Sequence, residues 1–391
     1  MSWFALLACG TELGDSAIPS DTAGEPDSGL APDENGDFLY DDSSILEFSL
    51  VLDDSALASL ASDPRADVHA DFSFLGTTYD VGLQLKGSES GSFRTMDEKA
   101  AFKVDFHQWD PEQRFFGIKR LTLNNMIQDN TMSHEHVAYR LFRDLGVPAP
   151  RHGYAKVTVN GEWFGLYGVV ETPDEQFLGR VFPDDAEGNL YEGGYGGDFG
   201  EGQAALFDVK ETEGLEADIA DLEALAMVVE NAEPAQMLVL INTYFDAEAL
   251  FSMWGGELVI ADTDGYTSLA NNFLVYHSPT TDLWTMIPWG PDQAFVGDQG
   301  VWIDFYGTLA QKCADSPNCT TEIAAGVQRA VTTLESETYT AWVETETTRI
   351  EADCRADPRS EWGDYGCRDA LVALRDWVRA RPSLIHADLA E

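Results

Sequence analysis

The sequence predicts an α+β protein with strands mainly in the first half of the chain and helices mainly in the second half. Over residues 101–106 apolar and polar side chains alternate, as they do in a strand with one buried face. Asn160-Gly161 joins two apolar runs, and this dipeptide favours a type I′ hairpin turn because both residues accept positive φ. Residues 234–257 instead repeat apolar side chains at helical spacing.

The first half of the chain predicts strands and one helix. The helix is expected to begin near Ser133, to bury an apolar face, and to end at Gly146, which can adopt the left-handed conformation of a cap. His134 and His136 point apart at their spacing, so we expect both to be surface or capping residues. The predicted strands cover residues 45–52, 67–74, 79–85, 101–106, 121–123, 154–159 and 163–170.

A Gly- and Ser-rich loop follows Lys86 and ends before the strand that contains Lys103. Such a loop can cover phosphates with its backbone N–H groups, and a strand lysine that faces a cleft is a common phosphate partner. Lysine is scarce in this chain, which favours that interpretation. The alternative is an ordinary surface hairpin with solvated lysines.

The second half of the chain predicts helices around a hairpin that pairs 272–277 with 283–288. The glycine-rich acidic stretch 193–203 lacks a flanking βαβ pattern, so we expect a mobile surface loop or a weak Ca²⁺ site there. The predicted helices cover residues 218–231, 234–257, 302–306, 321–352 and 369–390.

The chain has 391 residues and a formal net charge of −46 at pH 7. That length allows two ordinary domains or one large domain with insertions. So negative a surface disfavours non-specific nucleic-acid binding, because it repels the phosphate backbone. It suits basic partners, divalent cations or a saline habitat, and we attribute most of the charge to habitat.

The first residues end in Leu6-Leu7-Ala8-Cys9, which resembles the lipobox of a bacterial lipoprotein signal, although the segment is short and has no basic start. Lipidation of Cys9 would place the protein in the cell envelope through a lipid anchor. The predicted organisation is a signal remnant over 1–9, a disordered acidic linker over 10–43, and a folded domain over 44–391, with an N-terminal lobe over 44–192 and a C-terminal lobe over 193–391.

The other four cysteines can pair in three ways. We favour the local pairs Cys313–Cys319 and Cys354–Cys367, because both segments look like loops between helices and exported proteins form disulfides by default. A zinc site is the alternative, but the spacings lack a CxxC knuckle and no histidine lies beside them.

Polar residues at the ends of the predicted hairpin form a candidate site. Asp264 precedes Asn271 and Asn272 at the start of the first strand, and Asp292 follows the second strand. Because a paired hairpin brings its outer ends together, we expect these side chains to converge. Carboxylate and amide oxygens suit Mg²⁺ or Mn²⁺. The alternative is that Asp-Gly and Gly-Pro-Asp only mark ordinary loops.

Three ordered motifs run through the middle of the chain: Phe115 to Glu171, Gly188 to Gly193, and NNFLVY…IPWGPDQAF. Together they resemble the CotH family, the spore-coat protein H type of secreted atypical kinases. The resemblance implies a divergent protein-kinase-like fold of two lobes, β-rich and mainly helical. It also implies binding of ATP with Mg²⁺ or Mn²⁺ and phosphoryl transfer to Ser or Thr of a protein.

The resemblance assigns roles at the catalytic centre by position. Asp264 would be the catalytic aspartate, which orients the acceptor hydroxyl and takes its proton. The family's metal motif often has the form Pro-Trp-Asp-x-Asp, whereas this chain has Gly290 at the first acidic position. Asp292 is therefore the one metal carboxylate left in the motif, and Asn271 or Asn272 would supply a second ligand.

The same resemblance places ATP contacts in the N-terminal lobe. Lys86 and Lys103 match its basic positions and would hold phosphates. Glu171 would pair with one of these lysines, as a helix glutamate does in ordinary kinases.

Two functions are consistent with these residues. The first is an exported protein kinase that acts on a basic, Ser-rich protein. The alternative is a non-catalytic kinase-like surface or cell-envelope binding protein, which Gly290 and the scarcity of ATP outside cells favour. Gly-x-Ser-x-Gly, Walker A and HExxH patterns are absent from the sequence, which excludes the serine hydrolase, P-loop and zincin interpretations.

Overall fold

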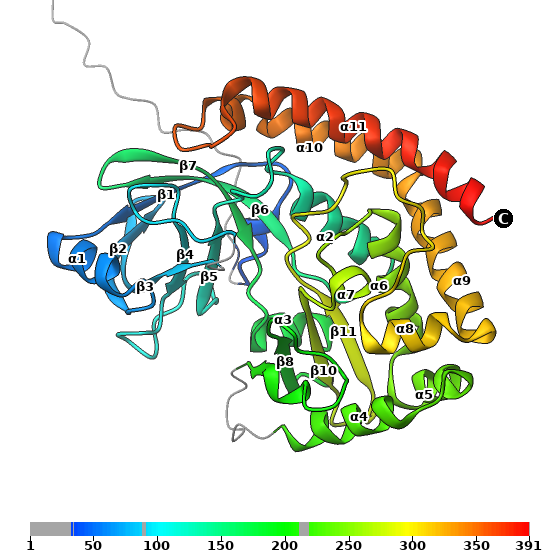
Figure 1. The fold of residues 1–391 in the computed structure, drawn as a ribbon. Coiled ribbons are helices and arrows are strands. Elements are labelled where there is room, and N and C mark those ends of the chain that lie inside the picture. The colour runs from blue at the N-terminus through cyan, green and yellow to red at the C-terminus, as the bar shows by residue number, and fades with distance from the viewer. Residues whose placement is uncertain (1–32, 34, 88–90, 211–218, 391) are drawn as a thin grey trace, which may run out of the picture. The chain divides into compact units, whose positions relative to one another are not determined.

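Seven strands close into a barrel in the first half of the chain (Figure 1). Their order is β1-β2-β3-β4-β5-β7-β6, and the neighbours within that order are antiparallel. The closing pair is parallel, with Leu46 of β1 opposite Ala155 of β6. The bounds are β1 (Leu46–Val51), β2 (Val68–Phe74), β3 (Thr77–Lys86), β4 (Ala101–Asp105), β5 (Arg120–Asn124), β6 (His152–Val159) and β7 (Glu162–Val170).

The computed structural model describes residues 33, 35–87, 91–210 and 219–390. The lipobox that ends at Cys9 and most of the expected linker lie outside these residues. The part from Pro32 onward forms one compact unit.

A second sheet follows the barrel, with the strand order β11-β10-β8-β9 (Figure 1). The predicted hairpin is confirmed as β10 and β11, with Phe273 opposite Pro288. Because β8 pairs with β10, the predicted lobe boundary after residue 192 falls inside a strand of this second sheet. The bounds are β8 (Asn189–Gly193), β9 (Phe207–Val209), β10 (Phe273–His277) and β11 (Trp284–Pro288).

Helix α6 lies at the centre of the second half and contacts α2, α7, α9 and β11. Its residues from Ala249 to Val259 are all buried. Gly255 and Gly326 permit the close approach of α6 to α9, because a Cβ on Gly255 would lie 2.2 Å from the backbone of Gly326. The helices are α1 (Asp54–Ser62), α2 (His134–Asp144), α3 (Glu175–Val181), α4 (Ala220–Asn231), α5 (Met237–Tyr244), α6 (Ala247–Val259), α7 (Tyr266–Leu269), α8 (Thr308–Ala314), α9 (Pro317–Leu334), α10 (Glu337–Ala356) and α11 (Gly363–Asp388), with short 3-10 turns η1 (Asp37–Tyr40), η2 (Ala204–Leu206) and η3 (Pro234–Gln236).

The loop between α10 and α11 binds the barrel. Asp357 forms an ion pair with Lys99 at 2.7 Å, and both side chains are fully buried. The same carboxylate accepts the backbone N–H of Leu166 in β7 at 2.9 Å. Both predicted disulfides are confirmed, and one of them, Cys354–Cys367, closes this loop; the other is Cys313–Cys319. The C-terminal helices are thereby fixed to the strands.

Several helical predictions need correction. Helices α1, α3, α7 and α8 occupy segments where the sequence predicts no helix, and 302–306 is not helical. The single helix expected over 321–352 is divided between α9 and α10. The single helix expected over 234–257 is broken into η3, α5 and α6, because Asp246 leaves the helical conformation and its side chain accepts the N–H of Ala249 to start α6.

Three solvent-exposure predictions are also wrong. The expected linker already folds at Asp37, since Phe38 and Leu39 are buried. His134 and His136 are 6 % and 1 % exposed rather than surface residues. In the stretch 193–203 Asp198 is buried and accepts hydrogen bonds from the hydroxyls of Tyr266 and Thr308, so it fastens this stretch to the helices.

Within the described part of the chain, no helix taken singly has the length and apolar content to cross a membrane. The bent pair made of Ala220–Asn231 and Pro234–Tyr244 meets that test of length and composition jointly.

The buried Lys99–Asp357 pair predicts a large stability effect. Lys99→Met should lower the free energy of unfolding by about 3–5 kcal/mol, because it leaves the Asp357 carboxylate buried without its cation. Urea denaturation measures the loss. The control is Arg368→Met, which removes an exposed pair with Asp369 and should cost less than about 1 kcal/mol. Equal losses in the two variants would contradict the assignment.

Candidate functional site

The predicted acidic site forms where the loop after α6 meets the ends of β10 and β11. Asp264 accepts hydrogen bonds from the amide groups of Asn271 at 3.1 Å and Asn272 at 2.8 Å. Gln293, the neighbour of Asp292, adds a third amide donor at 3.3 Å. The structure therefore brings Asp264, both asparagines and the loop of Asp292 together, as the hairpin geometry predicts.

Asp292 lies half-buried in this loop, close to other carboxylates. Its pKa is raised well above the ordinary value by burial and then by the charges of Glu135, Asp129 and Asp262. Several carboxylates therefore lie close together around Asp292. A divalent cation would balance their negative charge, which fits the oxygen donors present.

Glu135 on α2 is the acidic residue that faces Lys86, and no motif in the sequence predicts this role. Burial raises the pKa of Glu135 to about 7, and the nearby charge of Lys86 opposes that rise. Asn124 at the end of β5 donates a hydrogen bond to its carboxylate. Asp129 fixes this end of α2, because its carboxylate accepts the N–H groups of Ser133 and His134.

Lys86 ends β3 and points toward the acidic residues. Burial lowers its pKa, while the charges of Glu135, Glu192 and Asp292 act in the opposite direction. Lys86 therefore lies within the electrostatic influence of acids from α2, β8 and the loop after β11.

Lys103 belongs to a small basic group beside Lys86. In the antiparallel register Lys103 is opposite Gln84, so Lys103 and Lys86 lie on one face as diagonal neighbours. Desolvation and the charges of Lys210 and Lys86 lower the pKa of Lys103. A concentration of positive charge in so acidic a chain suits an anionic group.

Glu171 does not pair with a lysine, so that prediction is wrong. Its carboxylate lies 2.8 Å from Arg151 and 2.6 Å from Arg180, which hold the pKa of Glu171 below its usual value despite burial. These residues line a hollow of about 620 Å³ that Asp264 and Asp292 do not line. The reason for the error is that Glu171, which follows β7, is bound by Arg151 and Arg180, whereas the acid near Lys86 comes from α2.

Asp262 and Glu257 are further buried acids below the site, and sequence reasoning missed both. Glu257 accepts the backbone N–H groups of Tyr266 at 3.1 Å and Thr267 at 2.9 Å, and so shapes the loop that carries Asp264. Asp262 accepts the N–H of Asp264 itself at 3.1 Å. The sequence did contain a signal for these two acids. Both lie at or just after the apolar end of α6, where a charged side chain needs a buried partner.

The chain belongs to the CotH kinase protein family, whose model matches residues 83–385. It is 23 % identical over 231 residues to the inner spore coat protein H of Bacillus subtilis (strain 168), a match that covers 56 % of this chain and 60 % of that protein. It is 30 % identical over 98 residues to an inner spore coat protein H-like protein of the same strain, over 22 % of this chain and 30 % of the relative.

The chain therefore spans less than two thirds of the length of these curated relatives. Among solved structures, the Helicobacter pylori proinflammatory kinase CtkA matches with a TM-score of 0.37 at 9 % identity, over 78 % of this chain and 97 % of that chain. HipA in a HipA, HipB and operator DNA complex from Shewanella oneidensis MR-1 matches with a TM-score of 0.38 at 11 % identity, over 89 % and 75 %.

The Glu257 carboxyl predicts a pH dependence of stability. Burial raises its pKa from 4.5 to about 7, so the folded state holds a proton that the unfolded state has lost. This group should lower the free energy of unfolding by about 1.4 kcal/mol per pH unit as pH rises from about 4.5 to 7.

Urea titrations across that window measure the slope. Glu257→Gln should show a shallower decline than the unaltered protein, because the amide does not titrate. Glu248→Gln is the control, since it makes the same change at a carboxylate in the first turn of the same helix. Parallel slopes for all three proteins would contradict the prediction.

Proposed function

We propose that this protein is a protein kinase of the CotH type, which transfers the γ-phosphoryl group of ATP to a Ser or Thr hydroxyl of another protein. The observation that carries the proposal is that Asp264 is held by Asn271 and Asn272 beside the loop of Asp292. The charges of Glu135 and Asp292 act on Lys86 at the end of β3. A lysine held by a helix glutamate beside a metal-binding aspartate is the arrangement that phosphoryl transfer uses to position phosphates.

Each residue has a role in this proposal. Lys86 and Lys103 hold the phosphates. Glu135 keeps Lys86 oriented, which is the role that the sequence analysis gave to Glu171. Asp264 orients the acceptor hydroxyl and takes its proton. Its carboxylate is already aligned by three amide donors, so little reorganisation is needed when the acceptor arrives.

The oxygen donors of the site fit Mg²⁺ or Mn²⁺. Asp292 would hold the ion, and the side-chain oxygen of Asn271 or Asn272 would complete the ligands from the chain. When bound, the ion supplies positive charge that offsets the developing charge on the phosphoryl oxygens. The nearby carboxylates of Glu135, Asp129 and Asp262 add negative charge that favours such an ion.

The acceptor and the location are parts of the same proposal. An acidic chain of net charge −46 suits a basic, Ser-rich protein substrate. The two disulfides suit an oxidising compartment, so we propose an exported protein anchored by lipid at Cys9.

Two substitutions separate catalysis from binding. Asp264→Asn should lower phosphate transfer to a basic Ser-rich peptide by about 10³-fold or more, while ATP with Mn²⁺ still raises the melting temperature. Asp292→Ala should instead abolish the metal-dependent shift. Radiolabel transfer and thermal-shift titration are the two measurements, and Asp246→Asn serves as the control because it alters a helix cap elsewhere.

Full transfer activity in the Asp264 variant would refute its catalytic role. A metal-dependent ATP shift without transfer to any Ser- or Thr-containing peptide would support the non-catalytic alternative. That alternative rests on Gly290, which replaces an acid of the family motif.

Substitution of Gly290 tests directly whether the missing acid weakens metal binding. Gly290 has φ +53°, which aspartate tolerates better than most residues, and a Cβ there would meet only the Asn272 side chain at 3.6 Å. Gly290→Asp should therefore fold and tighten the binding of ATP with Mn²⁺ by about tenfold, the effect of 1.4 kcal/mol.

The matched control is Gly290→Asn, which has the same shape and backbone tolerance but no charge. Isothermal titration with ATP and Mn²⁺ compares the two variants. If both bind as the unaltered protein does, position 290 contributes nothing to the metal site.

A further inference from the structure

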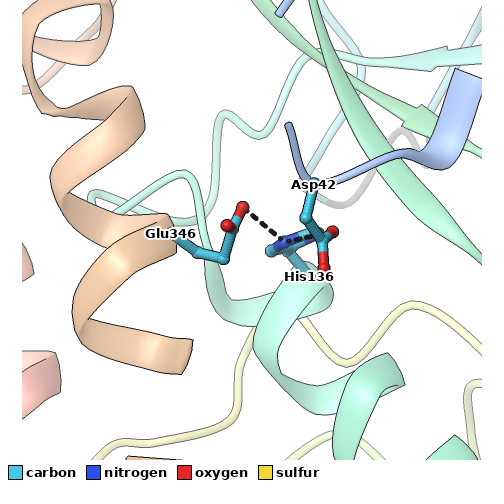
Figure 2. Close-up of side chains that lie close together, drawn as sticks. All are labelled: Asp42, His136 and Glu346. Carbon is cyan, nitrogen blue, oxygen red and sulfur yellow. Dashed lines mark hydrogen bonds and ion pairs between the residues drawn. The ribbon is translucent and has the colours of Figure 1, made fainter. Parts of the chain in front are cut away.

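A second group of metal-ligating side chains lies away from Asp264, where the N-terminal segment crosses between α2 and α10. Figure 2 shows Asp42, His136 and Glu346 pointing toward one another from these three parts of the chain. Their ligand atoms all lie within 4.8 Å of one another. His136 and Glu346 are buried, and Asp42 is half-buried.

The hydrogen bond of His136 Nδ1 determines whether Nε2 is free to bind a cation. Nδ1 lies 3.1 Å from the backbone carbonyl oxygen of His152, which can only accept, so Nδ1 carries the proton. Nε2 faces Glu346 Oε2 at 3.3 Å and Asp42 Oδ1 at 3.6 Å. Carboxylate oxygens are also acceptors, so a neutral ring would direct a lone pair at two negative groups. Arg349 bonds to the same Glu346 oxygen and Arg140 lies near Asp42, so both offset part of this negative charge. A cation bound to Nε2 and the two carboxylates would offset the rest.

The distances fit a tetrahedral ion. Metal–ligand bonds of about 2.0–2.2 Å at tetrahedral angles separate neighbouring ligand atoms by about 3.3–3.6 Å. The two separations from Nε2 are 3.3 and 3.6 Å. One imidazole nitrogen and two carboxylate oxygens would then occupy three positions and leave the fourth for water.

Surrounding groups hold each ligand in place. Trp342 donates its indole N–H to Asp42 Oδ2 at 2.8 Å, which leaves Oδ1 directed at His136. Arg349 donates to Glu346 at 3.0 Å. The His136 ring stacks on Trp342 with centroids 5.0 Å apart. Such outer contacts, above all the N–H of the ligand histidine on a carbonyl, are typical of metal sites.

We propose that Asp42, His136 and Glu346 bind one Zn²⁺ ion, which ties the N-terminal segment to α2 and α10. Imidazole is a better ligand for Zn²⁺ than for Mg²⁺, which prefers oxygen ligands alone. The site is separate from the one that contains Asp292 and does not depend on kinase activity.

Zinc titration of the full chain tests this site. Isothermal titration of protein stripped with EDTA should show binding of one Zn²⁺ ion. Asp42→Asn and Glu346→Gln should each weaken that binding by about 100-fold or more. Co²⁺ in place of Zn²⁺ should give the intense visible absorption of a tetrahedral site. The melting temperature should rise with each tenfold increase in free Zn²⁺.

Two controls separate this site from others. His386→Asn removes a surface histidine that faces Glu335 at 2.9 Å, and Asp292→Asn alters the other acidic group; both should keep the Zn²⁺. A third variant, His136→Asn, removes the nitrogen ligand. If it does not fold, Asp42→Asn still tests the site, because Asp42 is only half-buried.

The proposal is overturned if stripped protein binds no stoichiometric Zn²⁺, or if Asp42→Asn and Glu346→Gln bind it as tightly as the unaltered chain. It is also overturned if the melting temperature does not change with Zn²⁺.

Discussion

Crowding of carboxylates at the junction of the barrel and the second sheet is the constraint on which the site depends. Asp129 lies just before α2 and Glu135 in its first turn, Asp262 and Asp264 lie in the loop after α6, and Asp292 lies in the loop after β11. Their charges act on one another and on Lys86. Buried like charges repel strongly because little water screens them. The chain offsets this repulsion with hydrogen-bond donors: backbone N–H groups at the start of α2 serve Asp129, and side-chain amides serve Asp264.

The sequence predicts only the part of the site whose residues lie close together along the chain. Asp264, Asn271, Asn272 and Asp292 lie within one hairpin and its flanking loops, so strand pairing alone brings them together. Glu135 could not be found this way, because its approach to Lys86 depends on how α2 packs against strands far away in the chain. Its local signal was a charged residue on a helix whose neighbours are almost all buried.

The same distinction applies to the fold. Alternation and turn residues predict the antiparallel strands and the disulfide-closed loops, which are local features. No residue pattern indicates that β1 pairs in parallel with β6 to close the barrel. The break before α6 was also missed, because the apolar spacing of 234–257 continues across Asp246, whose backbone instead donates to Trp284 of β11 at 2.9 Å.

The Lys99–Asp357 contact has a consequence for the order in which the molecule can form. A ribosome completes the barrel strands long before it adds the loop that contains Asp357, so during synthesis Lys99 has a hydrophobic surrounding and no counterion. The ion pair can form only after the C-terminal loop has been made. Fragments that end before α10 lack this counterion for Lys99, and their barrel should be less stable than that of the full chain.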